Sequence, residues 1–284
     1  TMGNLVSILV HCNRGDEVIL GDQAHTFLYE AGGISAFGGI HSRQLKNNDD
    51  GTIDLDQIEA SIREENVHFP PTTLISLENT HNRCFGAALK PDYMLKVQEI
   101  AKKNNCKVHL DGARIFNASV SLNLDVKDLT ENVDSLTFCL SKGLSSPVGS
   151  IICGSSEFIK KARHIRKALG GGMRQAGIIA KFGEFSLDHM ISQIKKDHKN
   201  ALMLGQGLFK IKGIDIDIEK IHSNIVYFKL NENKSSYSRQ LIKSMNDKGI
   251  LFFEVSPNRY RLVTHYGIES SHIKIVLDTI SEIL

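Results

Sequence analysis

Two short segments of the chain place a carboxylate and a lone lysine directly after apolar runs. Asp111 follows the run 107–110, and Lys142 follows the run 136–139 between two small residues. An aspartate can pair with the protonated nitrogen of a pyridine ring, and a lysine can form a Schiff base; pyridoxal 5'-phosphate chemistry requires both. If both segments end at one edge of a sheet, this pair indicates chemistry on amino acids.

Each candidate residue also has an ordinary explanation. Most lysines lie on the surface, and Asp111 could cap a following helix, although a carboxylate at the end of a buried strand is costly unless paired. Arg114 could form a structural ion pair or clamp a substrate carboxylate with two hydrogen bonds. Arg261 lies in the alternating run 260–264, where it could be an edge-strand charge or close over the same carboxylate.

Two of the twelve histidines stand at positions where they could take part in chemistry. His25 follows a strand-like run and could lie flat on a planar cofactor or form hydrogen bonds in the core. His68 could move a proton at a hydroxyl group, because histidine titrates near neutrality. From the residues alone, a structural role is favoured for both. Thr1 and Met2 begin a helical pattern whose backbone N–H groups could bind a phosphate, and a plain helix start explains them equally well.

Composition excludes several classes of protein. The net charge is +2 with basic and acidic residues interleaved, so there is no nucleic-acid footprint. No apolar stretch approaches the ~20 residues needed to span a bilayer. The five cysteines form no CxxC pair, which argues against a disulfide framework or a zinc site and indicates a reducing, cytoplasmic compartment. We therefore expect a small-molecule partner, without metal, nucleic acid or membrane.

The elements that must position these residues alternate along the first two-thirds of the chain. Strand-like runs cover 17–20, 73–77, 107–110, 136–139 and 150–153, and helical patterns cover 5–11, 55–64 and 93–103. Short apolar strands separated by helices predict an α/β fold with a mainly parallel sheet covered on both faces. Ligands of such sheets bind beyond the carboxyl ends of the strands, where Asp111 and Lys142 fall.

The pattern changes after a long helical stretch over about 157–211, which glycines interrupt at 170–172. The rest of the chain shows three strand-like runs and two helical patterns, at 225–230, 251–255 and 260–264, and at 238–247 and 271–284. We predict a large α/β domain over residues 1–200 and a small α+β domain over 201–284.

Several longer motifs, taken in order, resemble those of the low-specificity L-threonine aldolases. These motifs are ENTHN at 78–82, HLDGARIFN at 109–117, CLSKG at 139–143, PVGS at 147–150, GGGMRQAG at 170–177 and RLVTH at 261–265. The resemblance runs nearly end to end. It implies the aspartate-aminotransferase-like fold type I of pyridoxal-phosphate enzymes, with a seven-stranded, mainly parallel sheet and a small C-terminal domain.

The resemblance also implies roles at the matching positions. Lys142 would hold pyridoxal 5'-phosphate as a Schiff base, Asp111 would pair with its ring nitrogen, and His25 would stack on the ring. Arg114 would contact the cofactor and, with Arg261, bind the substrate carboxylate.

The resemblance implies two further roles, the first of them at the site of a neighbouring subunit. The amides around Thr1 and Met2 would help hold the phosphate, and His68 stands where the family has a histidine near the substrate hydroxyl. Shared sites imply a homo-oligomer, a dimer or a tetramer. Family members continue upstream of Thr1, so we expect part of the first domain to precede this sequence.

The implied reaction is the retro-aldol cleavage of L-threonine or L-allo-threonine to glycine and acetaldehyde. The two rival functions are an aminotransferase or β-eliminating lyase with the same cofactor, and a truncated, non-catalytic subunit or binding module. The sequence leaves open the preferred isomer and the base that takes the hydroxyl proton, His68 or an ordered water.

Overall fold

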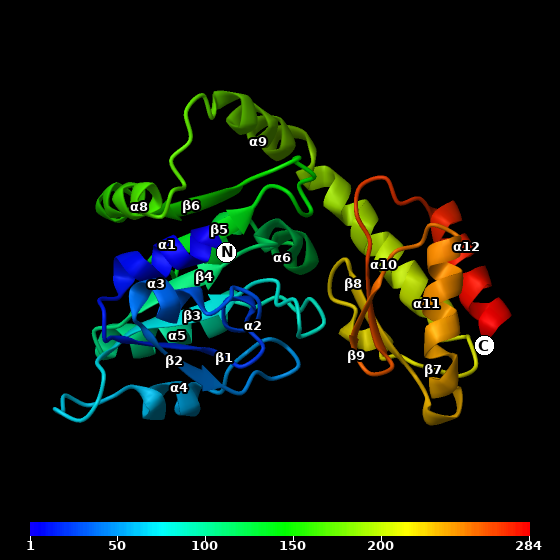
Figure 1. Cartoon of the computed structure of the whole chain (residues 1–284), viewed down its shortest axis with the longest axis horizontal. Helices are drawn as coiled ribbons and strands as arrows, with labels where there is room; N and C mark the ends of the chain where they lie inside the picture. Colours follow the sequence, from blue (N-terminus) through cyan, green and yellow to red (C-terminus); the bar gives the residue numbers. More distant parts are fainter.

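The computed structural model describes all 284 residues and arranges them around two sheets (Figure 1). The first sheet has six strands in the order β2-β1-β3-β4-β5-β6. They are β1 (Glu17–Gly21), β2 (His41–Leu45), β3 (Thr72–Glu78), β4 (Lys107–Asp111), β5 (Ser135–Cys139) and β6 (Ser150–Gly154). Every neighbouring pair is parallel except β5 with β6.

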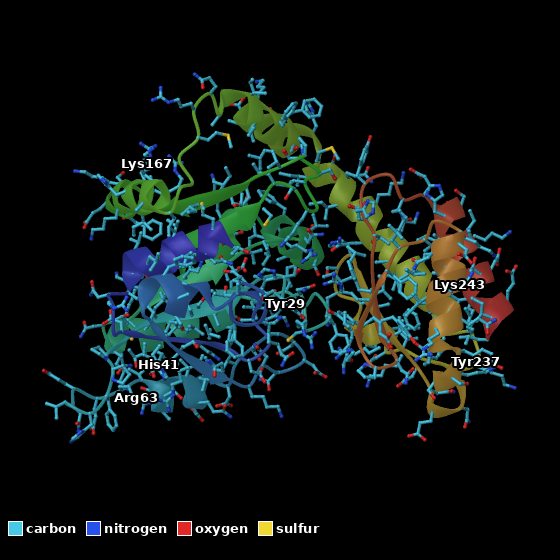
Figure 2. The ribbon with its side chains drawn as sticks, viewed as in Figure 1. Tyr29, His41, Arg63, Lys167, Tyr237 and Lys243 are labelled. Atoms are coloured by element: carbon cyan, nitrogen blue, oxygen red, sulfur yellow. The ribbon has the colours of Figure 1, made fainter.

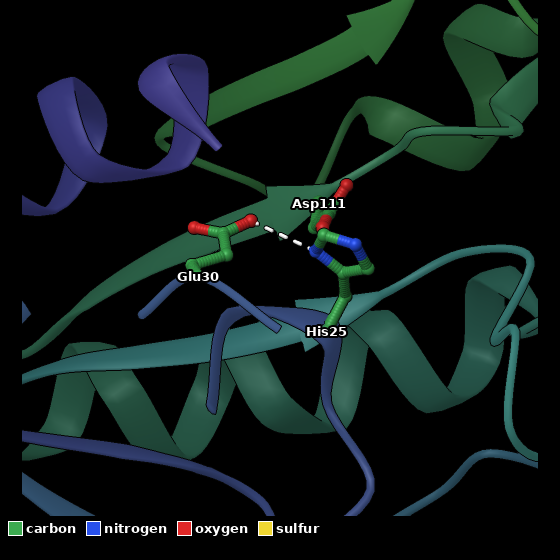
Figure 3. Close-up of side chains that lie close together, drawn as sticks. All are labelled: His25, Glu30 and Asp111. Carbon is green, nitrogen blue, oxygen red and sulfur yellow. Dashed lines mark hydrogen bonds and ion pairs between the residues drawn. The ribbon is translucent and has the colours of Figure 1, made fainter. Parts of the chain in front are cut away.

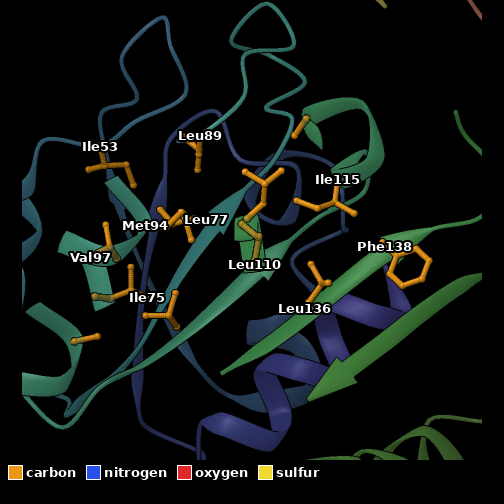
Figure 4. Close-up of a cluster of buried hydrophobic side chains, with 14 of the residues drawn as sticks. Ile53, Ile75, Leu77, Leu89, Met94, Val97, Leu110, Ile115, Leu136 and Phe138 are labelled. Atoms are coloured by element: carbon orange, nitrogen blue, oxygen red, sulfur yellow. The ribbon is translucent and has the colours of Figure 1, made fainter. Parts of the chain in front are cut away.

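Helices cover both faces of this sheet. They are α1 (Met2–His11), α2 (His25–Leu28), α3 (Gly33–Gly38), α4 (Leu55–Ser61), α5 (Pro91–Lys103), α6 (Ile115–Leu122), α7 (Val126–Thr130) and α8 (Ser156–Ala168). Along β1, Val18 and Leu20 pack in the core beneath α1 and α3, whereas Ile19 faces the larger core beneath α5. This alternation explains why the central strands read as continuous apolar runs, since both of their faces are buried. Figure 4 shows the larger core.

The second sheet is antiparallel, in the order β7-β8-β10-β9. Its strands are β7 (Ile214–Asp215), β8 (Ile225–Leu230), β9 (Phe253–Ser256) and β10 (Arg259–Val263), and its helices are α10 (Ile194–Leu208), α11 (Ser238–Asp247) and α12 (Ser270–Ile283). Tyr260 and Leu262 face the core that these helices cover. Arg261, between them, points to the opposite face, as strand alternation requires.

The two sheets contact each other through the uncovered face of the second one. Tyr227 of β8 donates its hydroxyl hydrogen to the Asn82 carbonyl at 3.0 Å, and Arg261 Nη1 donates to Asn82 Oδ1 at 2.8 Å. Asn82 lies four residues after the carboxyl end of β3. The second sheet therefore lies over the edge of the first sheet where parallel α/β folds bind ligands.

The structure differs from the sequence-based prediction at particular elements. The first sheet has six strands and not seven, because the first 154 residues provide only six paired runs. One of them, β2, was missed because it is a polar and partly exposed edge strand. The helical stretch 157–211 divides into α8, α9 (Gly177–His189) and α10, with an additional break near Ile191–Gln193.

The predicted domain boundary at residue 200 remains a prediction. Helix α10 runs through that position, and its residues Ala201, Leu204 and Leu208 pack in the core of the second sheet. None of the helices combines the length and the apolar character that crossing a membrane demands.

The central core should dominate the free energy of unfolding. Leu110 is fully buried in β4, so Leu110→Ala should lower the free energy of unfolding by about 2–5 kcal/mol. Leu95→Ala makes the same change on the exposed face of α5 and should stay within about 0.5 kcal/mol of the parent. Because the chain lacks tryptophan, urea unfolding followed by circular dichroism is the measurement. If the two variants lost the same amount of free energy of unfolding, this assignment of the core would be wrong.

Candidate active site

Asp111 is a buried carboxylate at the carboxyl end of β4, with 5% of its surface exposed. Its Oδ2 accepts a hydrogen bond from Asn4 Nδ2 at 2.8 Å, and its Oδ1 accepts one from the Ala113 backbone at 3.0 Å. Both donors are neutral, and no ion pair compensates the charge. A buried anion of this kind is suited to a cation brought by a ligand.

A second buried carboxylate, Glu30, shares the same amide donor. Its Oε1 accepts from Asn4 Nδ2 at 2.9 Å and lies 2.9 Å from His25 Nδ1, which Figure 3 shows beside Asp111. The other oxygen, Glu30 Oε2, is buried without a hydrogen-bond partner. The contact with Glu30 fixes the plane of the His25 ring next to Asp111.

Glu78 is a third buried carboxylate, and its hydrogen bonds come from backbone N–H groups and not from side chains. It ends β3 directly beside Asp111 in the parallel register. Glu78 Oε2 accepts from the His25 backbone N–H at 2.7 Å, and Oε1 accepts from that of Asn82 at 2.8 Å. It therefore ties the start of α2 to the loop that meets the second sheet.

Two guanidinium groups converge on this edge from different parts of the chain. Arg114 precedes α6 and is half-buried, and Arg261 reaches over from β10. Burial lowers the pKa of Arg114, and the nearby Arg261 charge lowers it further, with Glu78 acting in the opposite direction. Arg261 Nε is buried without a partner. Two neighbouring cations without ion pairs form a receptor for a carboxylate.

Lys142 follows β5 and lies, half-buried, in the turn after that strand. Its ammonium group forms no hydrogen bond or ion pair within the chain, and the parallel pairing of β4 with β5 places it at the same edge as Asp111. The turn is closely packed, because a Cβ at Gly143 would lie 2.6 Å from Asn117 Oδ1. Asn117 in turn contacts His198 Nε2 at 3.1 Å.

The structure does not bring His68 to this edge. His68 is exposed in the loop before β3, and seven strand residues, about 20 Å, separate the two ends of β3. The same loop begins at Arg63, whose Nε lies 3.5 Å from Glu17 where β1 starts; Figure 2 labels Arg63 and His41 there. Within one chain, His68 therefore lies at the opposite edge of the sheet from Asp111.

Thr1 and Met2 lie at the start of α1, one turn before Asn4. Because Asn4 contacts both Asp111 and Glu30, this first turn borders the site. Met2 is largely exposed. Their predicted contact with a phosphate stays a prediction.

Asp111, Glu30 and His25 could also be considered as metal ligands, since one ligand atom of each lies within 4.8 Å of the others. However, Asn4 N–H groups already donate to both carboxylates, and His25 Nδ1 contacts Glu30. These residues fit pyridoxal phosphate better. A protonated ring nitrogen matches Asp111, and an aldehyde matches the free amine of Lys142.

Sequence reasoning missed three residues of the site: Asn4, Glu30 and Glu78. Glu78 carried a usable signal, since it ends a buried strand just as Asp111 does. Asn4 and Glu30 carried none, because their contacts span 107 and 26 residues of the chain and depend on how α1 packs.

Comparisons with known proteins show which family the chain resembles along its length. The model of the β-eliminating lyase family matches residues 1–231. A probable low-specificity L-threonine aldolase 2 of Arabidopsis thaliana is 44% identical over 286 residues, covering 100% of this chain and 81% of the relative. A low specificity L-threonine aldolase of Escherichia coli K12 is 37% identical over 273 residues, covering 96% and 79%.

Solved structures show the same fold at lower identity. A putative L-allo-threonine aldolase from Listeria monocytogenes superposes with a TM-score of 0.82 at 17% identity, covering 100% of this chain and 80% of the other. A threonine aldolase from Leishmania major gives 0.81 at 20% identity, covering 100% and 82%.

Buried histidines around the site should make the protein sensitive to acid. Burial lowers the pKa of His11, His109 and His198 from 6.5 to about 4. Between these values the unfolded chain binds more protons than the folded one, so the free energy of unfolding falls as the pH drops from 6.5 to 4. His198→Gln should make this fall smaller, as measured by urea unfolding across that window. The exposed replacement His164→Gln is the control, and equal slopes in both variants would contradict the account.

Proposed function

We propose that this chain, which belongs to the β-eliminating lyase family and within it to the low-specificity L-threonine aldolases, cleaves L-threonine and L-allo-threonine to glycine and acetaldehyde. The observation that carries the proposal is the convergence at one sheet edge of a buried carboxylate, a free lysine amine and two arginines without ion pairs. Each of these groups corresponds to one requirement of amino-acid chemistry with an aldehyde cofactor.

Asp111, Lys142 and His25 would hold the cofactor. Pyridoxal phosphate, when bound, supplies an electron-poor ring that accepts the electrons released as a bond to Cα breaks. Asp111 would face the ring nitrogen and keep it protonated, and Lys142 would hold the aldehyde carbon. His25, whose plane is fixed by Glu30, would lie against the ring. The amides of Thr1 and Met2 would contact the phosphate.

Arg114 and Arg261 would bind the substrate carboxylate from two sides. Arg114 lies just before α6, and Arg261 lies in β10. A bound carboxylate would therefore contact both the part of the chain around the first sheet and the part around the second. Such a two-sided grip fixes the rotation of the substrate about Cα and so selects which bond stands in the reactive orientation. Asn82 would help to hold Arg261 in place, because its Oδ1 accepts from Arg261 Nη1 and its carbonyl oxygen accepts from the Tyr227 hydroxyl.

His68 would act on the site of a neighbouring copy. It cannot reach the site of its own chain, and its loop exposes 97% of Val67 together with much of Phe69. Helix α9 likewise exposes Ile178 and Phe185. We therefore propose a homo-oligomer, a dimer or a tetramer, in which His68 or an ordered water takes the proton of the substrate hydroxyl. The five free cysteines favour the cytoplasm, where the reaction would supply glycine.

The direct test supplies pyridoxal phosphate and L-threonine to the purified chain and measures its products. We expect acetaldehyde and glycine in equal amounts, and Lys142→Ala should abolish both together with the absorbance that borohydride removes. Lys102→Ala, on the exposed face of α5, is the matched control and should behave like the parent.

Other outcomes of this test would identify the rivals. A keto acid formed from threonine would mean transamination or elimination. A colourless protein that takes up no cofactor would mean a non-catalytic subunit. Allo-threonine in a parallel reaction establishes which isomer the site prefers.

The placement of His68 is tested by mixing two inactive variants. Lys142→Ala lacks the amine and His68→Asn lacks the candidate base, so each alone should lose most cleavage. After subunits exchange, hybrid sites combine Lys142 of one copy with His68 of the other, and about a quarter of the parental activity should return if the copies pair at random. No recovery, with exchange verified by mass spectrometry, would mean that His68 does not serve a neighbouring site.

A further inference from the structure

A chain of hydrogen bonds runs from Asp111 through the core to the far end of α1. Asn4 connects Asp111 with His109, since its Oδ1 lies 3.3 Å from His109 Nε2. His109 Nδ1 lies 2.8 Å from Ser135 Oγ, and that oxygen lies 2.7 Å from His11 Nε2. His109 contacts the site only through Asn4, and the proposed reaction uses neither histidine.

The contacts of Asn4 fix the direction of this chain. Both N–H bonds of its amide donate to carboxylates, Asp111 and Glu30, which can only accept. Asn4 Oδ1 must therefore accept, and it does so from Thr137 Oγ1 at 2.7 Å and from His109 Nε2. A flipped amide would place its oxygen against two carboxylates, so only one orientation is possible.

The orientation of Asn4 determines which ring nitrogen carries the proton in His109 and then in His11. His109 must carry a proton on Nε2, so in its neutral form Nδ1 accepts from the Ser135 hydroxyl. The same hydroxyl oxygen then accepts from Nε2–H of His11. Every donor in the chain points toward Asp111. Aligned dipoles of this kind strengthen one another and stabilise a negative charge at their end.

Burial lowers the pKa of both histidines and so favours neutral rings at neutral pH. His109 is completely buried, and burial holds its pKa at about 4, with Asp111 acting in the opposite direction and His11 in the same direction. His11 stacks on Phe158, with ring centres 4.9 Å apart. The charged groups that line a surface groove together with His11 are Asp134, Glu157, Lys107 and Lys161.

We propose that His109 is a positioning residue that acts through Asn4 to hold the Asp111 carboxylate in one orientation. The two carboxylates set which way the Asn4 amide faces, and the N–H on Nε2 of His109 restrains its oxygen from the other side, so that the amide holds Oδ2 of Asp111 in place. The consequence for catalysis rests on the proposed function, because it is the ring nitrogen of the cofactor that would need a charged, motionless Asp111. The hydrogen-bond direction itself does not rest on that function.

The first experiment needs neither cofactor nor substrate. Nitrogen-15 NMR of the histidine side chains distinguishes a proton on Nδ1 from one on Nε2. At neutral pH we expect His109 and His11 both to be neutral with the proton on Nε2. A proton on Nδ1 of His109, or a charged ring there, would overturn the proposal even if the protein proved to have no lyase activity.

The second experiment separates positioning from simple packing. His109→Leu removes the donor to Asn4 and should lower kcat for threonine about tenfold, which corresponds to one lost hydrogen bond of ordinary strength. KM should change little, because the arginines that bind the substrate are untouched. His109→Gln keeps an N–H near the position of Nε2 and should restore most of kcat.

Tyr93→Phe is the control, since it removes the two hydrogen bonds that the Tyr93 hydroxyl makes with the Ile53 backbone, neither of which involves Asp111 or Asn4. It should lower stability without changing kcat. The proposal is wrong if folded His109→Leu retains the parental kcat, or if folded His109→Gln is as slow as the leucine variant. A parent chain that fails to cleave threonine would overturn the proposed function alone, and the NMR result would still decide the hydrogen-bond direction.

Discussion

The rest of the site depends on one amide, the side chain of Asn4, which donates to two buried carboxylates at once. A carboxylate removed from water costs several kcal/mol unless its charge is compensated. Asp111 and Glu30 are both buried, and their facing oxygens share the N–H groups of Asn4. Because this arrangement leaves Asp111 without a cation of its own, its carboxylate is free to pair with the positively charged ring nitrogen of the proposed cofactor.

Around Asp111, the fold places negative and positive side chains on different sides of the site. Parallel pairing places Glu78 and Asp111 side by side at the ends of β3 and β4, and Lys142 follows the next strand. The second sheet lies over this edge and adds Arg261 opposite Arg114. The site therefore has carboxylates where a ring cation could bind and guanidinium groups where a carboxylate could bind. This arrangement matches an amino acid bound to pyridoxal phosphate.

The strand ends could be predicted from sequence because a parallel sheet brings its carboxyl ends to one edge. That rule located Asp111 and Lys142 without any knowledge of the fold's details. It could not locate Asn4 or Glu30, since their contacts arise from the packing of α1 and of the segment after α2. Applied to His68, which precedes the strand-like run 73–77, the same rule predicts the amino ends of the strands, so only the family resemblance placed His68 near the substrate. Strand β2 was missed for a different reason: a polar edge strand lacks the apolar run on which the prediction relied.

The charge of Asp111 is the central claim, and Asp111→Asn tests it most directly. Asparagine has nearly the same shape, so the variant should fold and bind substrate carboxylate as the parent does, while losing the anion that would keep the cofactor's ring nitrogen protonated. Turnover of L-threonine at saturating cofactor should then fall by at least about 100-fold, the scale on which one electrostatic partner contributes to catalysis. Turnover close to that of the parent would contradict the account.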